Sequence, residues 1–579
     1  MWLTLIFLVL SGLYLVIGSG WLIAVGGSPY YIAAGIVTLL IAWFVARRSA
    51  IALWLYALLL ATLIWAVAES GFDFWALAPR LDVLVIVGIW MLLPFTYRFF
   101  MTPARSGAMA LAVTLVLSGI ALVYAAFNDP QEINGTVNAS ATPPNATPGE
   151  KPGDWLAYGN SHGGTRYLPL AQINEKNVGD LQVAWTFRTG DMKGPNDPVE
   201  ITDEVTPLAV DGTLFFCTPH QNAIAVDGAT GKEKWRFNPE LKPDPSFQHV
   251  TCRGVSYYET PAGASGRAQG NTSGLAPCAQ RIILPVNDGR LFELDAHTGK
   301  RCLGFAKDGE LDLQHLQPVK TPGQYEPTSP PVVTSKVIVV ADAVMDNYGS
   351  REPSGVIRGF DVESGKLLWA FDPGARDPNA IPDDQHSFTT NSPNSWAPAA
   401  YDPKLDLVYL PMGATTPDIW GGNRTPEQER YASGLRALNA TTGKLAWFYQ
   451  TVHHDLWDMD LPAQPTIADI KDANGNIVPA IYAPAKTGNI FVLDCRNGHL
   501  IVPAPEQPVP QGTAKGDRLS PTQPYSQLTF RPQKNLTGTD MWGATMYDPL
   551  ACRVIFHRLR YEGPFTPPSF SRNTACRTA

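Results

Sequence analysis

The sequence has little charge at its N-terminal end and no motif that would bind a nucleotide or a zinc ion. Only eight of the 127 residues at that end are charged, and the first 46 carry no charge. The seven cysteines are scattered without a CxxC pair, which argues against a zinc-ribbon site and leaves their pairing open. No GxGxxG follows an expected strand, and no turn has the full spacing of a P-loop. The net charge of −8 argues against a nucleic-acid partner, which would require a basic face.

This poverty of charge indicates a membrane segment in residues 1–127. A break at residues 26–29 divides the first 46 residues into two apolar stretches, and further stretches lie at about residues 51–68, 83–97 and 107–127. Because a bilayer span needs about 20 apolar residues, we predict five transmembrane helices. The alternative, a soluble helical bundle, would require a charged outer face that this segment lacks.

The orientation of these helices follows from the basic residues in their loops. Two arginines precede the third predicted helix and two precede the fifth: Arg47, Arg48, Arg98 and Arg105. The loop between the third and fourth helices is instead mainly acidic. Because Lys and Arg favour cytoplasmic loops, the N-terminus is predicted to lie in the cytoplasm. Five spans then place everything after Phe127 outside.

Residues 128–153 are rich in Pro, Ala, Thr and Asn and are predicted to be a linker. Beyond them a phrase recurs in which an Asp or Asn is followed four residues later by Gly. The copies begin 55 to 78 residues apart, at residues 227, 295, 361, 439 and, more weakly, 494, and three of them continue to a Trp.

The recurring phrase has the chemistry of a β-hairpin turn. The Asp or Asn side chain can cap a backbone N–H, and the Gly supplies a positive φ. The Trp would then lie on the next strand and pack against a neighbouring sheet. Repeated four-stranded units of this kind predict a β-propeller, although the spacing is too long for WD40 repeats.

This Asp-x-x-Ser/Thr-Gly-Lys-x-x-Trp phrase resembles the tryptophan-docking motif of the PQQ quinoproteins, which are eight-bladed propellers. Five spans followed by such a propeller look like the membrane-bound glucose dehydrogenase branch. Local phrases at residues 154–173, 246–257, 391–402, 451–462 and 483–494 agree with this resemblance. Residues 249–253 (HVTCR) stand where the soluble methanol and ethanol relatives carry two adjacent cysteines, which favours the glucose branch.

The resemblance implies a fold of two parts, an α-helical membrane domain of five transmembrane helices and an all-β propeller of the eight-bladed quinoprotein type. The expected boundaries are a membrane anchor at residues 1–127, a linker at 128–153, a partial propeller at 154–569 and an aberrant tail at 570–579. The tail departs from the family pattern and is interpreted as the product of a frameshift or premature stop. An unclosed propeller would expose strand edges.

The resemblance also implies a function. The chain is expected to oxidise D-glucose or a related aldose to glucono-1,5-lactone with PQQ and Mg²⁺ or Ca²⁺, and to pass electrons to ubiquinone. The catalytic part would lie on the periplasmic side of a bacterial inner membrane. Two alternatives stay open: an inactive truncated fragment, and a non-enzymatic propeller scaffold like those of outer-membrane assembly.

Three residues are expected to act in catalysis. The resemblance identifies Asp458 as the base, and on an extended strand Asp455 would point to the opposite face. It identifies Lys486 as the cation that contacts the quinone oxygens, and His249 as a histidine near PQQ. The purely structural alternatives are a turn-capping role for Asp458, a hairpin position for Lys486 and a packing role for His249. The adjacent residues His453 and His454 would face opposite ways, which makes them a poor metal clamp.

The remaining expected site residues hold the cofactor or a metal. Arg253 would pair with a PQQ carboxylate through its planar guanidinium. Cofactor-pocket positions of the family match Glu204, Thr416 and Trp396, and Trp396 offers a flat apolar surface.

The metal-binding segment matches Asp346 and Asn347, whose oxygen ligands suit Mg²⁺ or Ca²⁺. The alternative for this pair is an ordinary turn, because Asp-Asn is common in turns.

Overall fold

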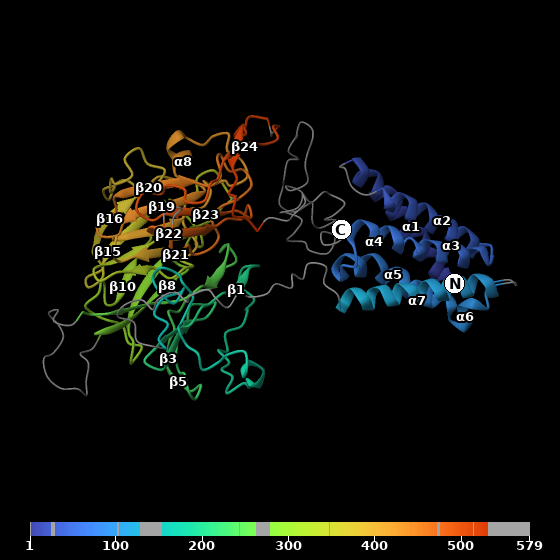
Figure 1. The fold of residues 1–579 in the computed structure, drawn as a ribbon, viewed down its shortest axis with the longest axis horizontal. Helices are drawn as coiled ribbons and strands as arrows, with labels where there is room; N and C mark the ends of the chain where they lie inside the picture. Colours follow the sequence, from blue (N-terminus) through green and yellow to red (C-terminus); the bar gives the residue numbers. More distant parts are fainter. Residues whose placement is uncertain are drawn as a thin grey trace. The chain divides into compact units, whose positions relative to one another are not determined.

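The computed structural model describes residues 2–24, 29–100, 104–127, 153–242, 244–261, 278–346, 348–471, 475–512 and 515–530. These residues belong to two compact units, a helical unit that ends at Phe127 and a mainly β unit that begins at residue 153 (Figure 1). Nearly all of the predicted linker and the whole of the predicted tail lie outside the described residues.

Helices occur at all five apolar stretches of the N-terminal region. The helices are α1 (Trp2–Ala24), α2 (Tyr30–Ala46), α3 (Ile51–Ala61), α4 (Leu63–Ser70), α5 (Phe74–Leu92), α6 (Pro94–Tyr97) and α7 (Arg105–Phe127). The third stretch is divided into α3 and α4 at Thr62, and α5 begins nine residues before the predicted position. By length and composition, α7 is the one helix in the described part that could cross a membrane. The five-span topology therefore stays a prediction.

Small residues and internal hydrogen bonds hold the helical unit together. A Cβ added at Gly35 of α2 would lie 2.8 Å from the side chain of Val16 on α1, so these two helices approach closely. The Trp90 indole donates to Thr4 Oγ1 at 3.0 Å. The Tyr56 hydroxyl donates to the carbonyl of Leu84 at 2.9 Å. These bonds satisfy polar groups among otherwise apolar side chains.

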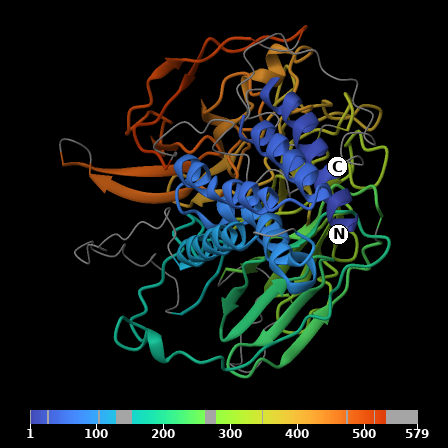
Figure 2. The same ribbon diagram turned by 90° about the vertical axis from the view of Figure 1, so that its right-hand side faces the viewer.

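The β unit is built from antiparallel sheets that follow one another in chain order (Figure 1 and Figure 2). The first is β2 (Leu208–Val210), β3 (Thr213–Cys217), β4 (Ala223–Asp227) and β5 (Glu233–Phe237). The second is β7 (Ser256–Glu259), β8 (Gln280–Val286), β9 (Arg290–Asp295) and β10 (Glu310–Asp312). The third is β12 (Val332–Val333), β13 (Val337–Val340), β15 (Ile357–Asp361) and β16 (Leu367–Phe371). The fourth is β17 (Ala400–Asp402), β18 (Leu407–Pro411), β19 (Gly434–Asn439) and β20 (Leu445–Gln450), and the fifth is β21 (Thr466–Lys471), β22 (Ile477–Pro484) and β23 (Ile490–Asp494).

Shorter elements connect these five blades and carry much of the site. A parallel pair is formed by β1 (Ile201–Asp203) and β6 (Val250–Cys252). Two antiparallel pairs are β11 (Tyr325–Glu326) with β14 (Ala343–Val344) and β24 (Glu506–Pro508) with β25 (Thr522–Pro524). A short helix, α8 (Pro426–Arg430), precedes β19.

Tryptophans join one blade to the next, as the recurring phrase predicts. The Trp235 indole donates to the carbonyl of Ala296 at 2.9 Å, and Gly299 of the same turn lies against its ring. The same pairing is made by Trp185, Trp369 and Trp447 with the carbonyls of Gly228, Ala440 and Cys495. All five turn glycines have φ between 67° and 71°. A side chain at these positions would be strained and would also collide with the indole where a tryptophan docks.

One turn lacks a tryptophan partner. At Gly365 the neighbour is Ala306, whose backbone N–H donates to the carbonyl of Ser364 at 3.0 Å. This blade junction is therefore made by backbone contact and by the nearby ring of Phe305. It explains why the phrase at residue 295 has no Trp after its Gly-Lys pair.

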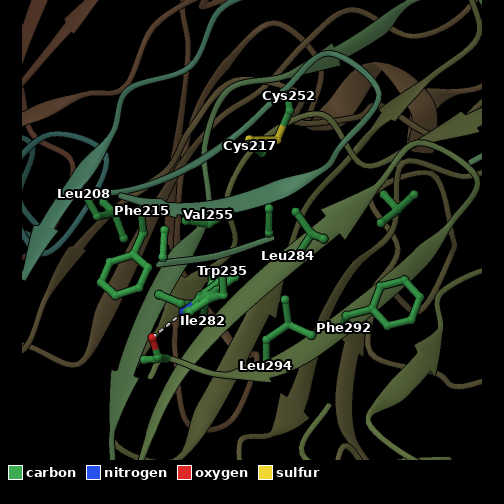
Figure 3. Close-up of a cluster of buried hydrophobic side chains, with 14 of the residues drawn as sticks. Leu208, Phe215, Cys217, Trp235, Cys252, Val255, Ile282, Leu284, Phe292 and Leu294 are labelled. Atoms are coloured by element: carbon green, nitrogen blue, oxygen red, sulfur yellow. Dashed lines mark hydrogen bonds between the residues drawn. A yellow bond between two sulfur atoms is a disulfide. The ribbon is translucent and has the colours of Figure 1, made fainter. Parts of the chain in front are cut away.

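The first two blades share one apolar core (Figure 3). Phe215 and Trp235 of the first blade belong to the same buried cluster as Ile282, Leu284 and Phe292 of the second. Burial of each such side chain stabilises the fold by about 1.5 to 3 kcal/mol. Strand β8 is buried along its whole length and β4 along all but its last residue, as expected for strands packed between neighbouring blades.

The pairing of the cysteines, which the sequence leaves open, is resolved for five of them. Cys217 bonds to Cys252, and Cys278 bonds to Cys302. Cys495 is free and buried. The first disulfide joins β3 to β6, and β6 is followed directly by Arg253 (Figure 3).

Candidate active site

Asp458 lies in an irregular loop between β20 and β21, so the expectation of an extended strand there is wrong. Its φ is 53°, a left-handed conformation that non-glycine residues seldom adopt. Asp455 is buried and accepts the backbone N–H groups of Trp457 and Met459 at 2.9 and 2.8 Å. It also accepts the hydroxyl of Ser433 at 2.8 Å. Asp455 therefore holds the loop together, while Asp458 is left to face Lys486.

Lys486 follows β22 and lies between two carboxylates. Its Nζ is 2.9 Å from Asp458 Oδ2 and 2.6 Å from Asp460 Oδ1. The other oxygen of Asp460 accepts the Trp396 indole N–H at 2.6 Å. Nζ also lies 5.6 Å from the centre of the Trp396 ring. Three of the predicted site residues, Asp458, Lys486 and Trp396, are thus brought together by Asp460.

The surroundings of Asp458 raise its pKa toward neutral pH. Burial and the negative charge of Asp460 raise the pKa of Asp458 to about 7, and Lys486 opposes this rise. Burial also raises the pKa of Asp460. Burial alone would lower the pKa of Lys486, but the two carboxylates outweigh it and raise that pKa. A carboxyl whose pKa lies near 7 can exchange a proton at physiological pH.

Two further aspartates add negative charge to this cluster. The Asp346 backbone N–H donates to Gln248 Oε1 at 2.9 Å, and its Oδ1 accepts Gln248 Nε2 at 2.8 Å. Asp418 is buried, and burial together with the charges of Asp346 and Asp458 raises its pKa well above the usual range. Asp458 and Asp460 contact the lysine, and together with Asp346 and Asp418 they form an oxygen-rich environment of the kind that Mg²⁺ and Ca²⁺ favour.

The expected metal pair is only half described, because Asn347 lies outside the described residues. Within the part of the chain that the structure describes, no three His, Cys, Asp or Glu side chains are arranged as a ligand set. The two adjacent histidines contact separate acids. His453 contacts Glu506, and His454 contacts Glu429 and Asp517.

Arg253 lies over the ring of Trp396 and pairs with Glu204, another of the predicted site residues. Its guanidinium carbon is 5.0 Å from the centre of the Trp396 ring, and its Nε is 2.8 Å from Glu204 Oε2. The two residues meet because each directly follows one strand of the parallel pair β1 and β6. A further bond from Arg253 to Thr328 Oγ1 at 2.6 Å fixes the guanidinium.

Two buried polar atoms near these residues have no hydrogen-bond partner among the described residues. They are Thr416 Oγ1, which belongs to a predicted site residue, and Asn394 Oδ1. Asn394 lies beside Asp460, since a Cβ added at Gly413 would be 3.1 Å from Asn394 Oδ1 and 3.3 Å from Asp460 Oδ2. Buried polar atoms without partners are rare and mark places where a ligand can bind.

His249 is connected to the acidic cluster through its neighbour Gln248. Its Nδ1 lies 3.3 Å from Oε2 of the buried Glu326, and its Nε2 lies 3.9 Å from Glu200. Burial opposes a positive charge here, but Glu326, Glu200 and Asp346 outweigh it and raise the pKa of His249. A carboxylate thus faces each nitrogen atom of the His249 ring.

Several residues of this site were not predicted. Three of them lie two residues from a predicted position and would have been found by extending each motif: Asn394, Asp418 and Asp460. Glu326 has no such signal, because it reaches the site only through the pairing of β11 with β14.

Comparison with known proteins agrees with this geometry. The PQQ family model described as "Glucose/ethanol/alcohol dehydrogenase, beta-propeller domain" matches residues 155–577. The quinoprotein glucose dehydrogenase of Escherichia coli (strain K12) is 65% identical over 568 residues, which cover 98% of this chain and 71% of that protein. Quinoprotein glucose dehydrogenase A of Acinetobacter calcoaceticus is 54% identical over 575 residues, covering 98% and 72% of the two chains. This chain belongs to the quinoprotein glucose dehydrogenase family.

Membership in the quinoprotein glucose dehydrogenases confirms the resemblance seen in the sequence, and with it the PQQ β-propeller domain and the class of oxidoreductase. A quinate/shikimate dehydrogenase (quinone) of Acinetobacter baylyi is also similar, at 37% identity over 575 residues that cover 97% of this chain and 70% of that protein. The higher identity to the glucose dehydrogenases agrees with the branch expected from residues 249–253.

The residues present fit the cofactor of a quinoprotein glucose dehydrogenase. PQQ is planar and carries three carboxylates and an ortho-quinone. Trp396 offers a flat ring, and Arg253 and Lys486 offer cations on that ring. Thr416 Oγ1 and Asn394 Oδ1 are buried polar atoms with no hydrogen-bond partner among the described residues.

Proposed function

We propose that this chain oxidises D-glucose, or a related aldose, to glucono-1,5-lactone with PQQ and passes the electrons to ubiquinone. The observation that carries the proposal is the contact of Asp458 with Lys486 beside Trp396, in a chain of the quinoprotein glucose dehydrogenase family. A base, a cation and a flat ring are the groups that sugar oxidation by a quinone requires. PQQ, when bound, would supply the quinone that takes the two electrons of the oxidation as a hydride from C1 of the sugar.

Asp458 is the proposed base. With its pKa raised to about 7, a substantial share of the carboxylate is ionised at neutral pH and can take the proton of the C1 hydroxyl. Its side chain is 45% exposed, which leaves it open to a substrate. Asp455 keeps the loop in place through two backbone N–H groups, so the base stays in its left-handed conformation.

The cofactor's charges would be met by cations of the site. Arg253 would exchange its partner Glu204 for a carboxylate of PQQ, and Lys486 would face the quinone oxygens. Trp396 would stack on the planar ring system. Asp346, with Asn347 beside it, would hold Mg²⁺ or Ca²⁺ through oxygen atoms.

We also propose that the helical unit crosses a bacterial inner membrane five times, with its N-terminus in the cytoplasm and the β unit in the periplasm. The length and apolar composition of α7 and the basic loops support this topology. Two disulfides in the β unit favour an oxidising compartment. Ubiquinone would be reached from within the bilayer.

Dye-coupled glucose oxidation by membranes that contain this chain tests the proposal. We expect activity that requires added PQQ and Mg²⁺, and a loss of roughly 100-fold to 10,000-fold in Asp458→Asn with PQQ binding retained. Asp469→Asn is the matched control, because this aspartate lies on β21 outside the site. Quinate and other aldoses, offered in place of glucose, measure the substrate range.

Absence of glucose oxidation from membranes that contain the protein and bind PQQ would contradict the proposal. Full activity in Asp458→Asn would contradict the assignment of the base. Protease added to intact spheroplasts should remove the β unit, and its protection would contradict the proposed orientation.

A further inference from the structure

We propose that Glu326 is a positioning residue for His249. Its buried carboxylate fixes the imidazole ring and supports a positive charge on it, so that Nε2–H is presented as a donor to the anionic cofactor. The inference rests on the function proposed above, because it takes PQQ as the ligand.

Glu326 is set in place by secondary structure. It ends the two-residue strand β11, pairs with Ala343 of β14, and is 1% exposed. A carboxylate this deeply buried is costly unless it is hydrogen-bonded and paired with a charge. The Glu326 carboxylate therefore needs hydrogen-bond donors and a positive charge close to it.

Among the described residues, the hydrogen-bond partners of the Glu326 side chain come from the segment that carries His249. Its Oε1 accepts the backbone N–H groups of Gln248 and His249 at 2.8 and 3.3 Å. Its Oε2 lies 3.3 Å from His249 Nδ1. Oε1 thus accepts two backbone donors, and an ionised Oε2 accepts the proton that His249 Nδ1 carries in the imidazolium. This arrangement fixes the ring orientation and leaves Nε2 on the far side.

Carboxylates face His249 from three neighbouring segments. Glu326 lies on β11, Glu200 precedes β1, and Asp346 follows β14. Together they raise the pKa of His249, against the effect of its burial. Glu326 makes the closest contact, since the Glu200 carboxylate is 3.9 Å from Nε2 and half-exposed. Glu326 is thus the main support of the imidazolium.

The same carboxylate also secures the segment next to the acidic cluster. Gln248, whose N–H it holds, makes two bonds to Asp346. The carbonyl of His249 accepts the side chain of the fully buried Asn287 at 3.1 Å. His249 is therefore held by its backbone on two sides, and Glu326 adds the closer of the two carboxylate contacts to its ring.

The variant Glu326→Gln tests this inference through the affinity for PQQ. A neutral amide keeps the size of the side chain but removes the charge, so the pKa of His249 should fall and less of it should be protonated at pH 8. We expect the Kd for PQQ, measured by quenching of tryptophan fluorescence, to rise roughly tenfold at pH 8. At pH 5.5, where His249 takes up a proton without help, the Kd should return to within about threefold of the unchanged protein.

Glu293→Gln is the matched control, because Glu293 is equally buried, is paired with Arg281 and lies outside the site. It should leave the Kd for PQQ unchanged at both pH values. A double-mutant cycle with His249→Ala adds a second test. Glu326→Gln should raise the Kd by less than about twofold when His249 is absent.

Equal effects of Glu326→Gln in the presence and absence of His249, or a loss of affinity that is the same at both pH values, would overturn the inference. An unchanged Kd at pH 8 would do the same. If Glu326→Gln does not accumulate as folded protein, Glu326→Asp replaces it, with a Kd increase of at least about threefold expected from the withdrawn carboxylate. Failure of the unchanged protein to bind PQQ would instead contradict the proposed function.

Discussion

Lys486 is the residue on which the charges of the site converge. It contacts Asp458 and Asp460 and lies against the ring of Trp396. The carboxylates stabilise the lysine as a cation, and the lysine in turn limits how far the pKa of Asp458 rises. Asp458 is also held at a φ of 53°, and strained residues of this kind cluster at active sites.

Replacement of Lys486 should change the pH dependence of the proposed reaction. Lys486→Met removes the charge that lowers the pKa of Asp458, so this pKa should rise above its present value of about 7. Because the base acts when ionised, the acid limb of the pH profile of kcat/KM should move to higher pH. We also expect kcat/KM at pH 7 to fall roughly 100-fold.

Lys486→Arg is the control for this prediction, because it keeps the positive charge in a different shape. Its acid limb should stay near that of the unchanged protein, even if the rate falls. A limb in Lys486→Met that moves to lower pH, or does not move, would contradict the electrostatic role given to the lysine.

The repeated turn is the element that assembles the β unit. In each copy a side-chain oxygen caps the turn, as Asp227 Oδ1 does for Thr230 N at 2.9 Å. Four of the five turn glycines then receive an indole, three of them from the preceding blade and Gly231 from Trp185 before the first blade, and the fifth receives a backbone contact. The unit is therefore stabilised by a chain of similar junctions, each between neighbours in sequence.

Substitution of a docking glycine should destabilise the β unit through two separate effects. Gly443→Ala places a Cβ 2.4 Å from the ring of Trp369 and also strains a φ of 69°. Gly212→Ala is the matched control, since it has a φ of 72° and open space around the added Cβ. We expect the control to lose about 1 kcal/mol and Gly443→Ala to lose about 3 kcal/mol of unfolding free energy.

Denaturant unfolding of the detergent-solubilised protein, followed by tryptophan fluorescence, measures both variants. Equal losses in the two would show that the indole yields without cost, and would contradict the importance of the docking contact.

At the scale of the whole molecule, links between distant segments hold the β unit together. His220 lies between Asp191 and Asp197, at 2.9 Å from Asp197. It therefore attaches the segment before β1 to the connection between β3 and β4 of the first blade. Hydrogen bonding to Asp191 raises the pKa of His220 to about 9, against the effect of burial. The Cys217–Cys252 disulfide makes a covalent link from the same blade to β6.

The free energy of unfolding should therefore decrease as the pH rises through the pKa of His220. Because its folded pKa of about 9 lies above its ordinary value of 6.5, its contribution is fully present below pH 6.5 and is lost as pH rises through 9. After allowance for partial exposure, this contribution is about 1 to 2 kcal/mol.

Thermal unfolding measured from pH 6 to pH 10 checks this prediction with His220→Gln. The variant should lose stability at pH 6 and little at pH 10, so its own pH dependence should be flatter. His386→Gln, at an exposed pair with Asp383, is the control and should change little at any pH. A uniform loss across the pH range would assign His220 a packing role instead.

Local chemistry made the repeating unit predictable from the sequence. The Asp and Gly of each turn act within a few residues, so their spacing indicates both the hairpins and the propeller. Local sequence patterns did not predict the loop of Asp458, where an extended strand was expected. There Asp455 bends the chain by binding backbone groups two and four residues on.

The sequence by itself determined the family and the blade turns and predicted the site residues, because short motifs carry all three. Only the tertiary structure decided which residues meet. Lys486 reaches Asp458 across 28 positions of sequence, and Glu326 reaches His249 across 77. Neither pair has a local signal, since strand pairing and blade packing bring them together. The charges that these contacts create then set the pKa values on which the proposed chemistry depends.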